Sequence, residues 1–328
     1  MAVTPGRDRA RSVKPARLAS AIGGLPYFGA EDLSRLLTVT EAADAIETAL
    51  SAGNGGPSSP QRWPVPLSAG ELLLMPCEQG AFGGVKVTTV AGDDPARVGP
   101  RIGGLYILWD AATLALLALF DAAALTSLRT PALSVVATRR LGVPTASRLV
   151  LFGTGPQAWG HLHAMASIRP ISHVTVIGRR AERVAEFIQR ARSAGLPVDP
   201  GNPSAVAAAD IVCTCTTASQ PLFDGMLLPA HAHVNAIGSH TPTARELDEA
   251  TIVRASVVVE NRASALAEAG DLIIPMIAGQ VARDIGLTEL AEVVDGALGA
   301  DRLTVFKSVG VSLADLAAAS EAYRRASA

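Results

Sequence analysis

The stretch Arg148-Leu-Val-Leu-Phe-Gly-Thr-Gly-Pro-Gln-Ala158 decides the fold of this chain. Its first five residues predict a strand, and Gly153-x-Gly155-x-x-Ala158 then forms a glycine turn that opens a helix. A strand, this spacing and a helix are the context of a dinucleotide-binding unit, in which Gly153 permits the tight turn and Gly155 lets the backbone approach a pyrophosphate. The helix N-terminus offers free N–H groups and a positive dipole to the phosphates. A purely structural glycine turn is the alternative.

Strand and helix patterns alternate along the residues that follow this turn. Such alternation predicts an α/β fold with a Rossmann-type, doubly wound parallel sheet and right-handed crossovers. The predicted strands are Arg148–Phe152, His173–Gly178, Asp210–Cys215, His233–Ile237 and Ser256–Glu260, and the predicted helices are Ala158–Ile168 and Ala181–Ala194.

The first half of the chain has a different pattern. Short extended segments separated by turn residues predict an antiparallel sheet built from hairpins, over Glu71–Met75, Gly84–Val90, Leu105–Asp110 and Leu114–Phe120. Helices are predicted over Tyr27–Leu50 and Thr126–Leu141, and Gly53–Pro60 is expected to be a loop. In the second helix Thr130 suits the N-cap and Pro131 suits the first helical position.

Length and composition indicate two folded domains, because the chain has 328 residues, of which 49% are hydrophobic and 18% charged. The formal net charge of −2 gives no reason to expect nucleic acid or an anionic membrane as a partner. No apolar run reaches the roughly 18 residues that span a bilayer. Residues 1–24 are expected to be a disordered, basic leader that lacks the apolar region of a secretory signal.

The three cysteines form an odd, sparse set that suits a reducing compartment, so we expect a cytoplasmic protein. Cys213 and Cys215 lie in an apolar run and are interpreted as small core residues. No metal site is expected there, since no further Cys or His stands nearby at ligand spacing.

The residues after the second Rossmann strand indicate the type of nicotinamide cofactor. An NAD enzyme usually places Asp or Glu at this point to hold the ribose hydroxyls, whereas this chain has Gly178-Arg179-Arg180. Because arginines can pair with a 2′-phosphate, NADPH is preferred and NADH stays possible. Solvated arginines at a helix start are the alternative.

Three cations of the first half, Arg62, Lys86 and Arg129, are candidates for a substrate anion site. Lys86 lies in a strand of apolar and β-branched residues, where a solitary lysine is costly unless it is paired. Arg129 stands just before the expected cap Thr130, where a carboxylate would meet both a guanidinium and a helix dipole.

Several motifs of this sequence, taken in order across roughly residues 25–328, resemble the ornithine cyclodeaminase/mu-crystallin family. They are Met75-Pro76, Gly84-Val-Lys86, Leu125-Thr-Ser-Leu-Arg-Thr130, Gly153-x-Gly-x-Gln157, Ala209-Asp-Ile-Val212, Asn235-Ala-Ile-Gly238, Arg245-Glu-Leu-Asp248 and Phe306-Lys-Ser-Val-Gly310 with Asp315.

The resemblance implies a homodimer and a division into two domains. An α+β domain for substrate binding and dimerisation would comprise residues 25–128 and 305–328, with a Rossmann domain inserted at 129–304. Arg62, Lys86 and Arg129 would hold a substrate carboxylate. The cofactor would contact the glycine turn and further residues near the strand ends, namely Arg129, Pro156, Gln157, Thr217, Ile237, Ser308 and Val309.

Departures from the family pattern bear on the reaction. Cyclodeaminases carry an aspartate after the Asn-Ala-(Ile/Val)-Gly strand and a lysine four residues later, where this chain has His240 and Ala244. The family's Pro-Gly-Asn-Pro is replaced here by Ala91-Gly-Asp-Asp-Pro95. These changes disfavour ornithine cyclisation. The arginines after the second strand are similar to those of the NADPH-using mu-crystallin branch, which resembles ketimine reductases.

The expected reaction is therefore reduction of a cyclic or linear α-imino acid, such as Δ1-pyrroline-2-carboxylate, by an oxidoreductase that acts on C=N bonds. A protonated imine is already electrophilic, so that Lys86 or His240 needs only to supply or relay a proton. His240 is equally well interpreted as a loop histidine without a role. Amino-acid dehydrogenation, cyclodeamination and NADPH or small-ligand binding without turnover are the alternatives.

Two further pairs of polar residues receive structural interpretations. His161 and His163 lie two apart on the first Rossmann helix and are expected at the surface or an interface, not as metal ligands. Glu246 and Asp248 are expected to open a helix as partners of its dipole.

Overall fold

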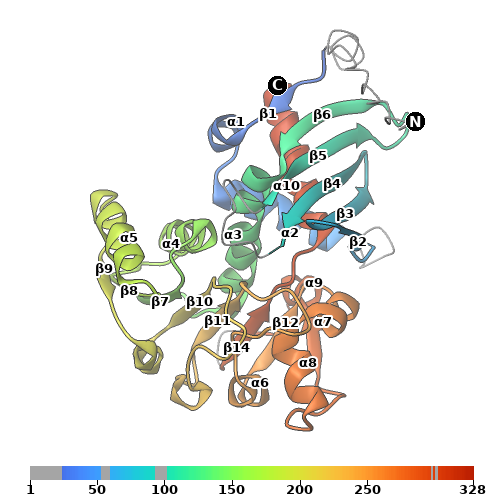
Figure 1. Cartoon of the computed structure of the whole chain (residues 1–328). Helices are drawn as coiled ribbons and strands as arrows, with labels where there is room; N and C mark the ends of the chain where they lie inside the picture. Colours follow the sequence, from blue (N-terminus) through green and yellow to red (C-terminus); the bar gives the residue numbers. More distant parts are fainter. Residues whose placement is uncertain (1–23, 53–59, 93–101, 297, 300–301) are drawn as a thin grey trace, which may run out of the picture.

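The computed structural model describes residues 24–52, 60–92, 102–296, 298–299 and 302–328. Two sheets organise these residues (Figure 1), and the first has six strands in the order β1-β6-β5-β4-β3-β2. Neighbouring strands of this sheet are antiparallel except β1 and β6, which are parallel. The strands are β1 (Tyr27–Phe28), β2 (Trp63–Leu67), β3 (Gly70–Gln79), β4 (Phe82–Ala91), β5 (Ile102–Asp110) and β6 (Leu116–Asp121). The predicted hairpin sheet is confirmed. Residues 53–59 of the predicted loop Gly53–Pro60 and residues 1–23 of the predicted leader 1–24 lie outside the described residues.

Alternate residues of the first sheet point to its buried face, as the period of two of a strand requires. On β5 these are Tyr106 and Leu108, and on β6 Ala118 and Phe120, which have no exposed area. The helices α2 (Val39–Ala52), α3 (Ala122–Leu141) and α10 (Ser312–Ala326) pack against one another, and α3 and α10 also pack on the strands. The C-terminal helix thus completes the core of the first sheet.

The predicted single helix over Tyr27–Leu50 is wrong. The structure has the short strand β1, then α1 (Ala30–Leu36) and, after a break at Leu37-Thr38, α2. A capping box accounts for the break, because the Thr38 backbone N–H donates to Glu41 (2.8 Å) while the Glu41 N–H donates to the Thr38 hydroxyl (3.3 Å). The Thr-x-x-Glu spacing was the sequence signal for this second helix start.

The predicted start of α3 is also wrong. The helix begins at Ala122, and the N-cap is Asp121, whose carboxylate accepts the Ala124 N–H at 2.8 Å. Pro131 therefore lies inside the helix, where it cannot donate a backbone hydrogen bond. Its ring packs on Gly160 of α4, where a Cβ would come within 2.7 Å of the Pro131 ring. This close approach holds α3 against the second half of the molecule.

The second sheet has eight parallel strands in the order β13-β12-β14-β11-β10-β7-β8-β9. The direction of winding reverses between β7 and β10, which confirms the predicted doubly wound Rossmann-type fold. Its strands are β7 (Arg148–Phe152), β8 (His173–Ile177), β9 (Val198–Pro200), β10 (Ile211–Thr214), β11 (His233–Ala236), β12 (Ser256–Val259), β13 (Leu287–Glu289) and β14 (Thr304–Lys307). Its helices are α4 (Pro156–Ile168), α5 (Ala181–Ser193), α6 (Glu249–Arg254), α7 (Arg262–Glu268), α8 (Gly270–Ile277) and α9 (Leu290–Val294), with 3-10 turns at Pro203–Ala208 and Gly225–Leu227.

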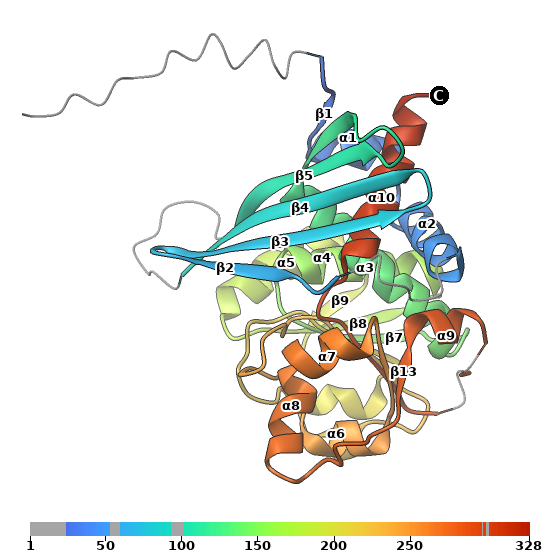
Figure 2. The same cartoon turned by 90° about the vertical axis from the view of Figure 1, so that its right-hand side faces the viewer.

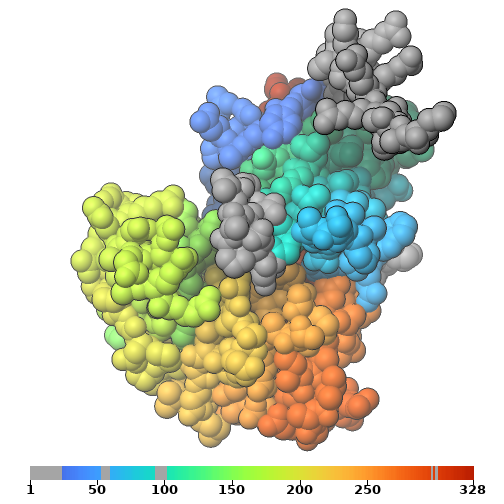
Figure 3. Space-filling model, in the orientation of Figure 1, coloured from blue at the N-terminus to red at the C-terminus, as the bar shows by residue number. Residues whose placement is uncertain are grey.

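The predicted boundary between residues 304 and 305 cuts through a strand. Residues 305–307 belong to β14, which lies between β12 and β11 in the eight-stranded sheet and not with the first sheet. The helix α3 likewise crosses the predicted boundary at 129 and packs on both α2 and α4. Figure 3 shows the two units at the surface, with the first sheet in blue and cyan above the orange region of α6 to α8.

Candidate active site

The glycine turn lies at the carboxyl end of β7. Gly153 has a φ of 111°, and a Cβ there would lie 2.4 Å from the Cys215 carbonyl oxygen, so that this position requires glycine. Gly155 is the N-cap of α4, with Pro156 at the start of the helix. A Cβ on Gly155 would have no atom within 4 Å. The turn therefore presents an open backbone and a helix N-terminus, which fit the pyrophosphate of a dinucleotide.

The other predicted cofactor residues lie along the same edge of the sheet. Thr217 follows β10 and is exposed, whereas Ile237 follows β11 and is buried. Gln157 is in the first turn of α4, and its buried Oε1 has no hydrogen-bond partner within the described part of the chain. Arg179 and Arg180 follow β8, and both are exposed at the start of α5.

Two of the predicted substrate cations share one buried carboxylate. Lys86 of β4 lies 2.8 Å from Asp315 Oδ2, and Arg129 of α3 lies 3.0 Å from Asp315 Oδ1. All three residues are buried. Asp315 is in α10, so that the C-terminal helix supplies the partner that a lysine in this strand requires.

Arg62 reaches the same place from the other side of the segment that follows β14. Its guanidinium donates to the carbonyl oxygens of Val309 and Gly310 and forms an ion pair of 2.9 Å with Glu268 of α7. Arg129 lies against Gly310, where a Cβ would be 3.2 Å from Arg129 Nη1. The structure thus brings Arg62, Lys86 and Arg129 together around residues 309–310.

This cluster has spare capacity for an anion. Arg62, Lys86 and Arg129 form ion pairs with two carboxylates, those of Asp315 and Glu268, while the carboxylate of Glu260 accepts N–H groups of the same segment. Arg129 Nη1 is buried and lacks a hydrogen-bond partner among the residues that the structure describes. Burial, followed by the neighbouring Arg129 charge, lowers the pKa of Lys86 to about 8, although Asp315 opposes the shift. A bound carboxylate would supply the acceptor that Arg129 Nη1 lacks.

The expected position of Arg129 at a helix entry is wrong. Since α3 begins at Ala122, Arg129 lies about two turns inside the helix, beyond the reach of the N-terminal dipole. Its partner is the Asp315 carboxylate instead.

The segment after β14 is held by a glutamate that the sequence reasoning missed. Ser308 donates its hydroxyl to Glu260 at 2.5 Å, and the N–H groups of Val309 and Gly310 donate to the same carboxylate at 2.9 and 3.1 Å. Glu260 immediately follows β12, so that only its place in the eight-stranded sheet brings it to this segment. The buried Ser308 hydroxyl therefore faces Glu260.

His240 lies on the exposed part of the loop after β11. The residue before it, Ser239, is buried and donates its hydroxyl to the Ala244 carbonyl at 2.5 Å. His240 follows β11, which is the neighbour of β14 in the eight-stranded sheet. The cation cluster surrounds residues 309–310, which follow β14.

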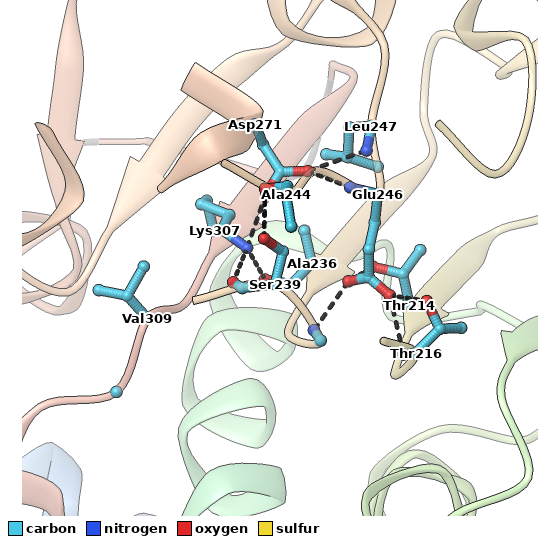
Figure 4. A network of polar contacts seen from close by, with 12 residues as sticks. Thr214, Thr216, Ala236, Ser239, Ala244, Glu246, Leu247, Asp271, Lys307 and Val309 are labelled. Carbon is cyan, nitrogen blue, oxygen red and sulfur yellow. Dashed lines mark hydrogen bonds and ion pairs between the residues drawn. The ribbon is translucent and has the colours of Figure 1, made fainter. Parts of the chain in front are cut away.

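A second buried network lies beneath this loop (Figure 4). Lys307 forms an ion pair of 2.9 Å with Asp271, and Glu246 accepts hydrogen bonds from residues after β10 and β11. The interpretation of Glu246 as a helix-start acid is wrong, because α6 begins at Glu249 and Glu246 is fully buried. Asp248 does cap α6 and accepts the Thr251 N–H at 2.8 Å.

The two histidines of the first Rossmann helix, His161 and His163, differ in their surroundings. His161 is buried, not at the surface as expected, and contacts Ser134 at 2.9 Å, while burial lowers its pKa to about 4. His163 is exposed. Among the described residues no group of three or more His, Cys, Asp or Glu could hold a metal ion. None of the helices that the structure describes is long and apolar enough to cross a membrane.

Comparison with known proteins relates this geometry to named relatives. The chain is 36% identical over 251 residues to a Δ(1)-pyrroline-2-carboxylate reductase of Bacillus thuringiensis, which covers 74% of this chain and 77% of the relative. It is 30% identical over 309 residues to the ketimine reductase mu-crystallin of Macropus fuliginosus, which covers 90% of this chain and 96% of the relative. The solved structure of Thermococcus litoralis Δ(1)-pyrroline-2-carboxylate reductase, in complex with NADH and L-proline, superimposes with a TM-score of 0.85 at 29% identity and covers 92% of this chain and 97% of that chain.

Three of the sequence motifs agree with these similarities: the glycine turn after β7, the Gly84-Val-Lys86 segment of β4 and the Phe306–Gly310 segment at the end of β14. Residues 29–328 match the ornithine cyclodeaminase/mu-crystallin family, and the chain belongs to that family.

Proposed function

We propose that this chain is an NAD(P)H-dependent oxidoreductase that reduces a cyclic or linear α-imino acid, such as Δ1-pyrroline-2-carboxylate, to the amino acid. The observation that carries the proposal is the buried Lys86–Asp315–Arg129 cluster with its unpartnered guanidinium nitrogen beside Gly310. The pyrroline-2-carboxylate and ketimine reductases among its relatives support the choice of substrate class.

The cations would hold the substrate by its carboxylate. Arg129 Nη1 has no hydrogen-bond partner among the described residues, and Arg62 and Lys86 add positive charge nearby. Holding the carboxylate fixes the C=N carbon relative to the sheet edge, and such positioning contributes strongly to rate. The nicotinamide, when bound, supplies the hydride to that carbon. The imine nitrogen takes up a proton, for which Lys86, with a pKa of about 8, and His240 are the candidate donors.

The cofactor would lie across the carboxyl edge of the eight-stranded sheet. Its pyrophosphate would rest on the Gly153–Gly155 turn, and the exposed guanidinium groups of Arg179 and Arg180 would pair with a 2′-phosphate. NADPH is therefore the proposed cofactor, with NADH as the weaker one. The remaining contacts are proposed at Arg129, Pro156, Gln157, Thr217, Ile237, Ser308 and Val309.

The outer face of the first sheet supports a homodimer. Figure 2 looks onto this face, with α10 behind the strands. Leu105 and Ile107 of β5 point away from the buried residues Tyr106 and Leu108, and Leu105 is 39% exposed. An apolar sheet face of this kind fits a second copy of the same face related by a twofold axis. Leu105→Glu should shift the protein from dimer to monomer in sedimentation velocity.

The location proposed for the protein is the cytoplasm. No disulfide joins Cys77, Cys213 and Cys215, and Cys77 and Cys213 are buried. Cysteines outside disulfides suit a reducing compartment.

A screen of NADPH oxidation tests the function directly. Cyclic pyrroline and piperideine carboxylates and linear imino acids are offered in turn, and mass spectrometry identifies the amino acid formed. Oxidation that requires ammonia with pyruvate or glyoxylate would identify an amino-acid dehydrogenase instead. Tight NADPH binding without oxidation by any imino acid would contradict the proposal.

Changing Arg179 and Arg180 together to Ala should lower the NADPH to NADH ratio of kcat/KM and leave the NADH reaction unchanged.

A further inference from the structure

The network of Glu246, Asp271 and Lys307 joins loops that leave three neighbouring strands of the eight-stranded sheet (Figure 4). Those strands are β14, β11 and β10, and their carboxyl ends form the edge along which the proposed cofactor lies. None of the three side chains has a part in the proposed chemistry. All three are fully buried.

Glu246 ties the loop after β10 to the loop after β11. Its Oε1 accepts the backbone N–H and the hydroxyl of Thr216, at 2.8 and 2.6 Å. Its Oε2 accepts the Thr214 hydroxyl and the Gly238 N–H, both at 2.7 Å. The four contacts use the whole acceptor capacity of the carboxylate. Gly238 lies so close that a Cβ there would be 2.5 Å from Glu246 Oε1.

Lys307 ties the same loop to β14. Its ammonium donates to the carbonyl oxygens of Ser239 and Ala236, at 2.6 and 3.3 Å, and pairs with Asp271 Oδ2 at 2.9 Å. Asp271 Oδ1 accepts the N–H groups of Glu246 and Leu247, at 2.7 and 2.9 Å, and so fixes the backbone that carries Glu246. Glu246 thus makes four contacts and Lys307 three, and among the described residues Asp271 Oδ2 has the ion pair with Lys307 as its only contact. Most of these contacts go to backbone groups, so that the network mainly fixes the backbone of the loops.

We infer that Lys307 and Glu246 are positioning residues, which hold the segment Ile237–His240 against the nicotinamide end of the cofactor site. Both ends of the segment are held, by Gly238 N–H on Glu246 and by Ser239 carbonyl on Lys307. Ile237 directly precedes the anchored Gly238, and His240 directly follows the anchored Ser239. This inference rests on the proposed function, since it assigns the network to hydride transfer at this edge.

The test compares Lys307→Met with the wild-type protein. Loss of the Ser239 and Ala236 contacts frees the loop, and kcat should fall on the order of 100-fold, as expected for a displacement of about 1 Å in the reacting groups. The dissociation constant of NADPH, measured by fluorescence, should change much less than kcat, because the glycine turn, Arg179 and Arg180 keep their contacts and only the contact at Ile237 is loosened. In the protein without cofactor, amide hydrogen exchange at Ile237 and Gly238 should become faster.

Arg169→Met is the matched control. Arg169 also donates to backbone carbonyls, those of Thr138, Gly142 and Val143, but it lies near the amino end of β7. The Arg169→Met variant should have a lower melting temperature than the wild-type protein and the same kcat per folded molecule. Equal losses of kcat in both variants would show that Lys307 acts through stability alone and would overturn the inference, as would unchanged exchange at Ile237 and Gly238 in Lys307→Met.

Glu246→Gln keeps the inference testable if Lys307→Met does not fold. The amide keeps the shape of the side chain, but in either orientation its NH2 group faces a backbone N–H, that of Thr216 or that of Gly238, and cannot accept from it. A smaller loss of kcat and faster exchange at Thr216 and Gly238 are expected, and wild-type values for both would again overturn the inference. If the wild-type protein reduces no imino acid, the proposed function fails, whereas the exchange data still report on the anchoring of the loop.

Discussion

Two buried ionic clusters lie in this molecule, and their hydrogen-bond capacities differ. In the Lys86–Asp315–Arg129 cluster one guanidinium nitrogen has no partner within the residues described, and two cations share the single carboxylate of Asp315. In the Glu246–Asp271–Lys307 network the carboxylates outnumber the lysine, and the Glu246 acceptors are filled by backbone and hydroxyl groups. An open donor in a buried site favours ligand binding, whereas a filled set of contacts favours a fixed backbone.

The strongest test of this difference removes the open donor. Arg129→Met should lower kcat/KM on the order of 1,000-fold, because truncating one partner of a buried charge pair costs about 2–5 kcal/mol of binding. Asp315 keeps Lys86 at 2.8 Å, so the variant should still fold. Steady-state kinetics with the best imino acid provide the measurement. Arg183→Met, which removes an exposed cation of α5 paired with Glu186, is the control and should retain full activity.

The second test compares the two clusters by stability. Lys307→Met leaves Asp271 without its only cation among the described residues, and the free energy of unfolding should fall by about 3–5 kcal/mol. Lys86→Met should cost less, because Asp315 retains Arg129 at 3.0 Å. Urea denaturation of both variants gives the two values. A larger loss of unfolding free energy in Lys86→Met than in Lys307→Met would contradict the assignment of the Lys86–Asp315–Arg129 cluster to ligand binding and of the Glu246–Asp271–Lys307 network to holding the backbone.

The third test uses the pKa of Lys86, which is about 8. Below this pH the ammonium is charged and contributes to anion binding; above it the charge is lost. The inhibition constant of a carboxylate without a titrating imine, such as pyrrole-2-carboxylate, should therefore rise above pH 8, by at most about tenfold per pH unit, until binding by Arg62 and Arg129 alone sets its upper value. Arg129 lowers this pKa, so that Arg129→Met should move the rise to higher pH. Lys86→Arg should abolish it, since arginine stays charged.

The two clusters also show how far the sequence alone leads. The glycine turn and strands such as β7, β8 and β11 follow from local spacing and periodicity, and the structure has them. Lys86 was expected to need a partner, but Asp315 is 229 residues away along the chain, and no spacing rule connects them. Glu260 and Asp271 are missed for the same reason, because only the order of the parallel strands brings them to the edge of the sheet.

Competing local signals explain why the start of α3 and the break between α1 and α2 were predicted wrongly. Thr130-Pro131 has the pattern of a helix start, but Asp121 caps the helix first, and Gly160 leaves room for the proline ring inside it. The break between α1 and α2 was written in the sequence as a capping box at Thr38 and Glu41, within a run of apolar residues that favoured one long helix. Tertiary contacts and capping therefore decided the boundaries that periodicity left open.

The smallest expected effect concerns His240, which lies at the end of the segment that the filled network anchors. His240→Gln should lower kcat less than tenfold, because a protonated imine needs little further acid catalysis and Lys86 stands in the substrate cluster. The loop backbone should be unchanged, since Ser239 is held through its own carbonyl and hydroxyl. The measurement is kcat of His240→Gln and of the wild-type protein with the best imino acid. A loss as large as that of Arg129→Met would instead identify His240 as the proton donor. The donor would then lie in the loop Ile237–His240 and not in the Lys86–Asp315–Arg129 cluster.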